Sequence, residues 1–305
     1  MLITDNVSHM HYKGDKLNMS KTNKIRVYFD YNIYDMILKK QFEYIDCAKI
    51  DVFYSVSHVE EFYKAQKNDN NGKNVEALNQ IRDIITSYAK RGIILNPSPS
   101  RIIAKSESFD ECLAIIRQFD TRYVVDQDGK TLYELNSKNV KDLQEEDSAV
   151  INNSNLSSEE IWKRPEVLAK LSNFNYYYKN YKNVMIKKQL SIYGLSVYRR
   201  INKFKLPEEF QLTHNCFKSG NYSFDLLEVV IEFLNNQLCS CGYHKDKNVK
   251  KTQSGIHDVS HIIYATYCNY FVTHDKGLIA RANAIYFYLG LDTKAIDIDE
   301  IEKIK

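Results

Sequence analysis

The sequence has few of the residues on which strongly turned or cross-linked folds depend. Its 305 residues include only 10 glycines and 4 prolines, which argues against a barrel or sandwich of many short strands and favours helices. Six cysteines are too sparse for a disulfide scaffold, so we expect a reducing, cytoplasmic environment. No apolar run approaches the roughly 20 residues that span a bilayer, and no secretory signal opens the sequence. We therefore expect a soluble protein with no membrane partner.

The chain does have enough apolar residues, 44%, for one large core or two modest ones. Short apolar runs alternate with segments of helical periodicity near both ends, and Ser57 is available as the N-cap of one of these helices. This alternation predicts an α/β fold with a mostly parallel five-stranded sheet flanked by helices. The five expected strands cover residues 24–29, 49–55, 92–96, 269–274 and 293–298.

Acidic residues follow these strands, at the end where parallel sheets bind ligands. Asp30 directly follows the first strand, Glu60 and Glu61 follow the second, Asp258 opens a helix, and Asp275 follows the fourth strand. Two carboxylates about 4 Å apart repel by ~4 kcal/mol at an effective dielectric near 20, so a cluster of four requires a cation. Hard oxygen ligands select Mg²⁺ or Mn²⁺. The alternative for each acid singly is that it caps a helix.

The same residues resemble a known family, the PIN-domain nucleases. The D-x-N pattern of that family is matched by Asp30 and Asn32, and its glutamate by the pair in VFYSVSHVEEF. Its last two acids are similar to Asp258 and to the Asp275 of Thr273-His274-Asp275. The resemblance covers about residues 24–118 and 250–305. It implies a PIN-like core in two parts, interrupted by a large, mostly helical insert over residues 119–249.

The resemblance also implies an activity, which is metal-dependent hydrolysis of phosphodiester bonds. It makes Asp30, Glu61, Asp258 and Asp275 the catalytic metal ligands for Mg²⁺ or Mn²⁺, with Glu60 as the fallback for Glu61. Asn32 and Thr273 would orient those ligands through hydrogen bonds. The family analogy favours a ribonuclease acting on RNA or single-stranded nucleic acid, and leaves open a protein inhibitor or regulator.

The insert is electrically polarised. Residues 134–160 carry seven acids against two lysines, whereas residues 161–205 carry eleven Lys or Arg against one acid, a net charge of +10. Lysines can neutralise phosphates, and aromatic faces can stack on unpaired bases. We expect nucleic acid to bind here, through Lys179, Lys182, Lys187, Lys188, Tyr177 and Tyr178. The alternative is a solvated helix whose tyrosines pack into the insert's own core.

Four histidines flank the acids: His58, His257, His261 and His274. Their position suggests proton shuttling or metal ligation, but a capping or solvent-facing role is more frequent for a histidine, so none is assigned to catalysis. A second functional hypothesis belongs to a different class. In it the acids are structural, and the chain is a catalytically weak nucleic-acid-binding or effector protein on a PIN-like scaffold.

Overall fold

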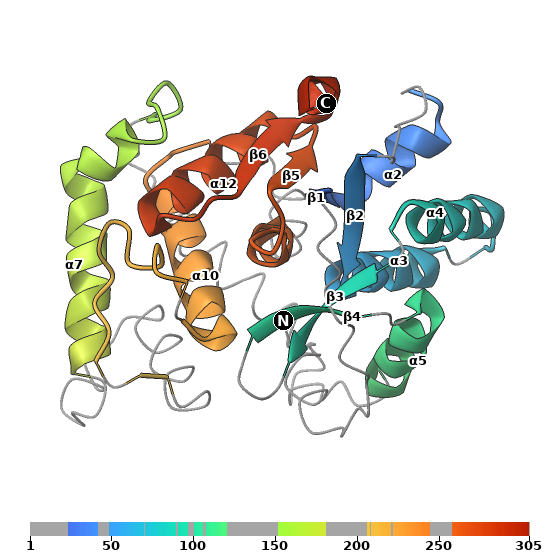
Figure 1. Ribbon diagram of the computed structural model, residues 1–305, viewed down its shortest axis with the longest axis horizontal. Coiled ribbons are helices and arrows are strands. Elements are labelled where there is room, and N and C mark those ends of the chain that lie inside the picture. The colour runs from blue at the N-terminus through green and yellow to red at the C-terminus, as the bar shows by residue number, and fades with distance from the viewer. Residues whose placement is uncertain are drawn as a thin grey trace. The chain divides into compact units, whose positions relative to one another are not determined.

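The computed structural model describes residues 24–41, 49–69, 71–89, 91–96, 101–105, 108–120, 152–180, 206–207, 209–220, 222–244 and 258–304. These residues divide into two compact units, each described here by itself (Figure 1). Unit 1 takes the described residues up to 120 together with 258–279 and 293–304, and unit 2 takes 152–244 and 280–292. Unit 2 therefore includes a stretch near the C-terminus in addition to residues of the expected insert.

Unit 1 is built on a parallel sheet flanked by helices, as the sequence predicts for an α/β fold. The six strands among the described residues lie in the order β4-β3-β2-β1-β5-β6, with β4 antiparallel to β3 and the other neighbouring pairs parallel. The expected count of five is wrong because β4 was missed, since its apolar part is only three residues long. The strands are β1 (Ile25–Phe29), β2 (Ile50–Ser55), β3 (Arg91–Asn96), β4 (Arg101–Lys105), β5 (Tyr270–Thr273) and β6 (Lys294–Asp297).

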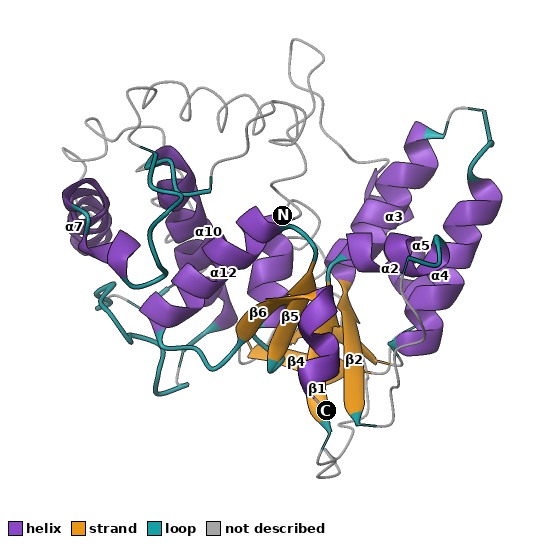
Figure 2. Ribbon diagram, turned by 90° about the horizontal axis from the view of Figure 1, so that it is seen from above, coloured by secondary structure: helices purple, strands orange, loops and turns teal. Residues whose placement is uncertain are grey.

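Four helices of unit 1 lie on one side of the strands: α2 (Tyr31–Leu38), α3 (Val56–Asn68), α4 (Val75–Tyr88) and α5 (Phe109–Asp120) (Figure 2). Successive residues of a strand point to opposite faces, so Val27 and Phe29 join the core beneath these helices whereas Tyr28 points the other way. A short 3₁₀ segment, η2 (Ile298–Ile304), adds Ile298 and Ile301 to the same core.

Strand β1 lies in the middle of the sheet and is held on both edges, by β2 and by β5. The ladder extends one residue beyond the strand, because the backbone N–H of Asp30 donates to the carbonyl of Val272 at 2.8 Å. Asp30 is therefore fixed at the carboxyl end of the central strand.

Helix α3 begins earlier than its sequence suggests. The N-cap is Ser55, not Ser57: the Ser55 hydroxyl accepts from the Ser57 N–H at 3.2 Å, and the Ser55 N–H donates to His58 Nδ1 at 3.0 Å. This reciprocal pair is a capping box in which histidine takes the place usually held by Glu or Gln. It turns the chain directly from β2 into the helix that carries Glu61.

Unit 2 is helical, with η1 (Glu160–Lys163), α7 (Pro165–Lys179), α10 (Phe224–Ser240) and the part of α12 (Lys276–Leu289) from residue 280 onward. Trp162 anchors η1 by donating its indole N–H to the carbonyl of Ala284 at 2.9 Å. Helix α12 ends at Leu289, and the sequence predicts Gly290 as the residue that closes it; this glycine has φ +73°, and a Cβ there would lie 2.7 Å from Asn215 Oδ1. None of the described helices is both long and apolar enough to cross a bilayer.

Candidate metal centre

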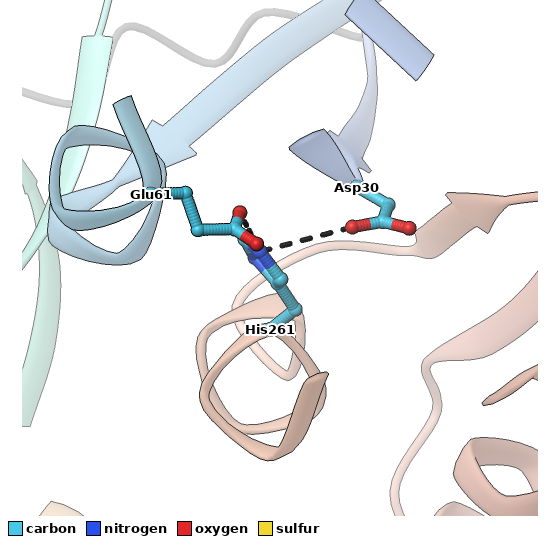
Figure 3. Close-up of side chains that lie close together, drawn as sticks. All are labelled: Asp30, Glu61 and His261. Atoms are coloured by element: carbon cyan, nitrogen blue, oxygen red, sulfur yellow. Dashed lines mark hydrogen bonds and ion pairs between the residues drawn. The ribbon is translucent and has the colours of Figure 1, made fainter. Parts of the chain in front are cut away.

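Three side chains from three separate elements converge at the carboxyl end of β1. Asp30 follows β1, Glu61 lies on α3, and His261 lies on a helix over residues 258–265 (Figure 3). One ligand atom from each lies within 4.8 Å of the other two. Glu61, rather than its neighbour Glu60, belongs to this group, because adjacent residues of a helix point about 100° apart.

The carboxylate of Asp30 is buried and does not cap a helix. Asp30 precedes α2, but its side chain makes no capping hydrogen bond. Instead, Oδ2 accepts from the Thr273 hydroxyl at 2.8 Å and from Asn32 Nδ2 at 3.2 Å, so these two residues orient the carboxylate. Its other oxygen, Oδ1, faces His261 Nε2 at 3.7 Å. Two donors thus hold one oxygen and turn the second toward the other members of the group.

His261 is fully buried and lies between the two acids. Its Nε2 is 2.8 Å from Glu61 Oε2. Burial alone lowers the pKa of His261, but Glu61, Asp30 and Asp258 outweigh that effect and raise it to about 9. Burial, reinforced by Asp30, raises the pKa of the Glu61 carboxyl. Without a metal, the imidazolium therefore supplies the positive charge that two adjacent carboxylates require.

A line of hydroxyl groups holds the other side of the His261 ring. Nδ1 lies 2.8 Å from the hydroxyl of Tyr28, which lies 2.6 Å from the hydroxyl of Ser55. His58 packs against the His261 ring with centroids 4.8 Å apart, and its Nε2–H donates to the carbonyl of Phe29 at 2.7 Å. Burial and the nearby His261 lower the pKa of His58, so His58 is neutral.

Two of the predicted acids lie outside this group of three. Asp258 is half-buried, one helical turn before His261, and contributes to the raised pKa of that histidine. Asp275 caps α12, because its Oδ1 accepts from the backbone N–H groups of Gly277 at 2.8 Å and Leu278 at 3.0 Å. The Asp275 N–H also donates to the Thr273 hydroxyl at 3.2 Å, which links it to Asp30 through one side chain.

The residues expected to bind nucleic acid differ in their exposure to solvent. Lys179 is exposed at the end of α7 and Tyr177 is half-buried, while Lys182, Lys187 and Lys188 lie outside the described residues. Tyr178 is fully buried and donates its hydroxyl to the carbonyl of Pro207 at 2.7 Å. The stacking role expected for Tyr178 does not fit this position, because neither face of its ring is accessible to a base.

His261 was considered with three other histidines in the sequence but was not selected as a site residue. His261 stands three residues after Asp258, so both fall on the same side of one helix. That spacing could have indicated His261 as a site residue. Closeness to an acid in the sequence is not enough by itself, because His274 is equally close to one, yet it is exposed and pairs with Asp297 at 3.2 Å. His257 lies outside the described residues.

The geometry fits a divalent cation. Two ligand atoms that each bind one ion at about 2.1 Å lie about 3.0–3.4 Å apart in octahedral or tetrahedral coordination. The separations from His261 Nε2 lie just outside that range on either side, at 2.8 Å to Glu61 Oε2 and 3.7 Å to Asp30 Oδ1, so shifts of a few tenths of an ångström would admit an ion. Fold and site together define an α/β protein with a candidate metal centre beside its central strand. Comparisons with protein-family models, curated proteins and solved structures found no match.

Proposed function

We propose that the protein is a PIN-like, metal-dependent nuclease that hydrolyses phosphodiester bonds of RNA or single-stranded nucleic acid. The observation that carries the proposal is the orientation of Asp30. Its carboxylate is buried, is not used as a helix cap, and turns Oδ1 toward Glu61 and His261. A structural acid at a helix start would instead accept hydrogen bonds from backbone N–H groups, as Asp275 does with Oδ1.

The side chains take distinct roles in this proposal. Asp30 and Glu61 hold a divalent ion, Mg²⁺ or Mn²⁺, and Thr273 and Asn32 keep Asp30 in the orientation that binding requires. When bound, the ion polarises the phosphate, activates the attacking water and stabilises the leaving oxygen. Asp258 adds negative charge from one helical turn away, which strengthens the attraction for a cation.

Substrate binding in the proposal relies on charge. The stretch from residue 161 to residue 205 carries a net charge of +10, which suits a phosphate backbone. Ion pairs with acids reduce the contribution of Lys163, which lies beside Glu159, and of Arg164, which lies beside Glu166. Lys179, exposed at the end of α7, is the described lysine of the expected set that we assign to phosphate contact.

A second function has one observation in its favour. The raised pKa of His261 means that the metal-free group already has an internal counter-charge, so the acids can be structural without a metal. The protein would then bind nucleic acid, or act as an effector, without efficient turnover. The two functions differ in one measurable property, which is metal-dependent cleavage.

The test is cleavage of single- and double-stranded RNA and DNA with Mg²⁺, with Mn²⁺ and with EDTA. We expect cleavage of single-stranded RNA that EDTA abolishes and that Asp30→Asn also abolishes. Asp35→Asn is the matched control, because Asp35 lies on α2 close to Asp30 in sequence but is paired with Lys39 at the surface. Cleavage that survives in Asp30→Asn would refute the proposed site, and the absence of any cleavage would favour the second function.

A further inference from the structure

We propose that His261 is itself a metal ligand through Nε2, and that this nitrogen makes the centre selective for a transition-metal dication such as Mn²⁺ over Mg²⁺. The inference rests on the proposed metal-dependent function and deepens it. It replaces an all-carboxylate site with a mixed set of one nitrogen and two oxygens. Imidazole suits transition metals, whereas Mg²⁺ prefers oxygen ligands.

The first support is the direction in which the ring points. Nε2 of His261 faces Glu61 Oε2 and Asp30 Oδ1, and Oδ1 is the Asp30 oxygen that Thr273 and Asn32 do not hold. A neutral imidazole that carries its proton on Nδ1 presents a lone pair at Nε2. In the metal-free protein this position holds the proton that Nε2 shares with Glu61 Oε2, so a cation that replaces the proton would meet the Nε2 lone pair and both carboxylates.

The second support is the partner at the other ring nitrogen. Nδ1 of His261 meets the hydroxyl of Tyr28, which can either accept or donate a hydrogen bond. With a proton on Nδ1, the Tyr28 oxygen accepts it and the Tyr28 hydroxyl donates to Ser55 Oγ. With the proton on Nε2, the direction of both hydrogen bonds reverses, and no heavy atom has to move. The Tyr28 and Ser55 hydroxyls therefore accommodate the tautomer that a metal ligand needs.

The third support is the rigidity of the ring. His261 is fully buried, its ring centroid lies 5.6 Å from that of Tyr28 and 4.8 Å from that of His58, and its donor atoms have defined partners. A ligand held in one orientation by packing and by a hydrogen bond at its far nitrogen binds a metal without further ordering. Tyr28 acts through His261, so it is a positioning residue.

A spectroscopic experiment tests the inference directly. The full-length protein is titrated with Mn²⁺, and pulsed electron paramagnetic resonance then measures coupling between the bound Mn²⁺ and ligand nitrogen. We expect nitrogen coupling in the unmodified protein, its loss in His261→Gln, and its retention in His274→Gln, which changes an exposed histidine. Bound Mn²⁺ without nitrogen coupling would overturn the inference and leave the proposed nuclease function standing. Nitrogen coupling without any cleavage would support the inference and overturn the nuclease function. Failure to bind Mn²⁺ would overturn the inference, and failure to bind either Mn²⁺ or Mg²⁺ would overturn both.

Affinities for the two metals supply the second measurement. Tyr28→Phe keeps the ring and removes the hydroxyl, so we expect Mn²⁺ affinity to fall roughly 10- to 100-fold, as for other partners of metal-binding histidines. Mg²⁺ affinity should fall less, because it depends on the two carboxylates. Tyr270→Phe on β5 is the matched control and should change neither. His261→Asp, which makes the donor set all oxygen, should lower the preference for Mn²⁺ over Mg²⁺; an unchanged preference in both His261→Asp and Tyr28→Phe would overturn the inference.

Discussion

Replacing His261 with glutamine removes the positive charge that lies between Asp30 and Glu61 in the metal-free protein. The pKa of His261 is about 9, against an ordinary value of 6.5. Because each pKa unit corresponds to about 1.4 kcal/mol, this difference is worth roughly 3 kcal/mol of folding stability, as an order of magnitude. His261 is buried, so solvent does not screen the interaction.

The direction in which this stabilisation changes with pH follows from the linkage between proton binding and folding. The folded state binds the proton of His261 more tightly than the unfolded state does, so the stabilisation is complete below about pH 6.5. It declines as the pH rises and is lost above about pH 9, with a slope of up to about 1.4 kcal/mol per pH unit between those values. We therefore expect the unmodified protein in EDTA to lose this stability over that range, and His261→Gln to lack the contribution throughout.

The assay is urea unfolding in EDTA, followed by circular dichroism at about pH 6, 7.5 and 9. The free energy of unfolding is compared between the unmodified protein and His261→Gln at each pH, so that the titration of groups that do not contact His261 cancels. The free energy of unfolding of His274→Gln should change with pH in the same way as that of the unmodified protein, because His274 is exposed. A difference between the unmodified protein and His261→Gln that stays constant across the pH range would refute the reasoning.

Three further predictions concern single side chains. Asp275→Asn should leave the melting temperature unchanged, because Asn caps a helix as well as Asp does, but should reduce Mn²⁺-dependent cleavage if the charge contributes to the site. Tyr178→Ala should lower the free energy of unfolding by about 3–5 kcal/mol, whereas the exposed Tyr176→Ala should change it by less than about 0.5 kcal/mol, as urea denaturation will measure. Ser55→Ala should cost about 0.5–2 kcal/mol through the lost N-cap; no loss in a thermal melt would contradict the capping role.

The sheet was largely predictable because its strands are short apolar runs with turns or helices on both sides. The runs identified in the sequence lie in β1, β2, β3, β5 and β6. Strand β4 was not identified because Ile102, Ile103 and Ala104 alone are too short a run to predict a strand. It forms because its backbone pairs with β3 over five residues, a tertiary interaction that no local pattern displays.

The acids of the site were predictable from their positions after strands, but their individual roles were not. Asp30 and Asp275 both follow a strand and precede a helix, yet only Asp275 caps its helix. The difference comes from Thr273, whose hydroxyl lies 243 positions along the chain from Asp30 and binds its carboxylate. The role of His261 is also decided by residues distant in the sequence, because its partners Tyr28 and Glu61 lie 233 and 200 positions away.

The burial of Tyr178 could have been predicted. Val167, Leu171, Phe174 and Tyr178 are spaced by four, three and four residues, which places them on one side of α7, and all four are buried. The neighbouring tyrosines at 176 and 177 fall off this stripe and are exposed or half-buried. Charge density and aromatic content drew attention to the segment, but helical phase decides which of its rings reaches solvent.

The placement of Tyr28 on β1 and of Asp30 directly after it has a consequence for insertions and deletions. The two residues are two positions apart in the chain, and they approach His261 from its two ring nitrogens, Tyr28 at Nδ1 and Asp30 at Nε2. Adding or removing one residue within the strand would exchange its two faces, so both contacts would be lost together while apolar side chains took their places. Hydrogen bonds to strands on both edges leave β1 no room to absorb such a change. Active descendants of this sequence should therefore vary in length between the elements and keep the length of this strand.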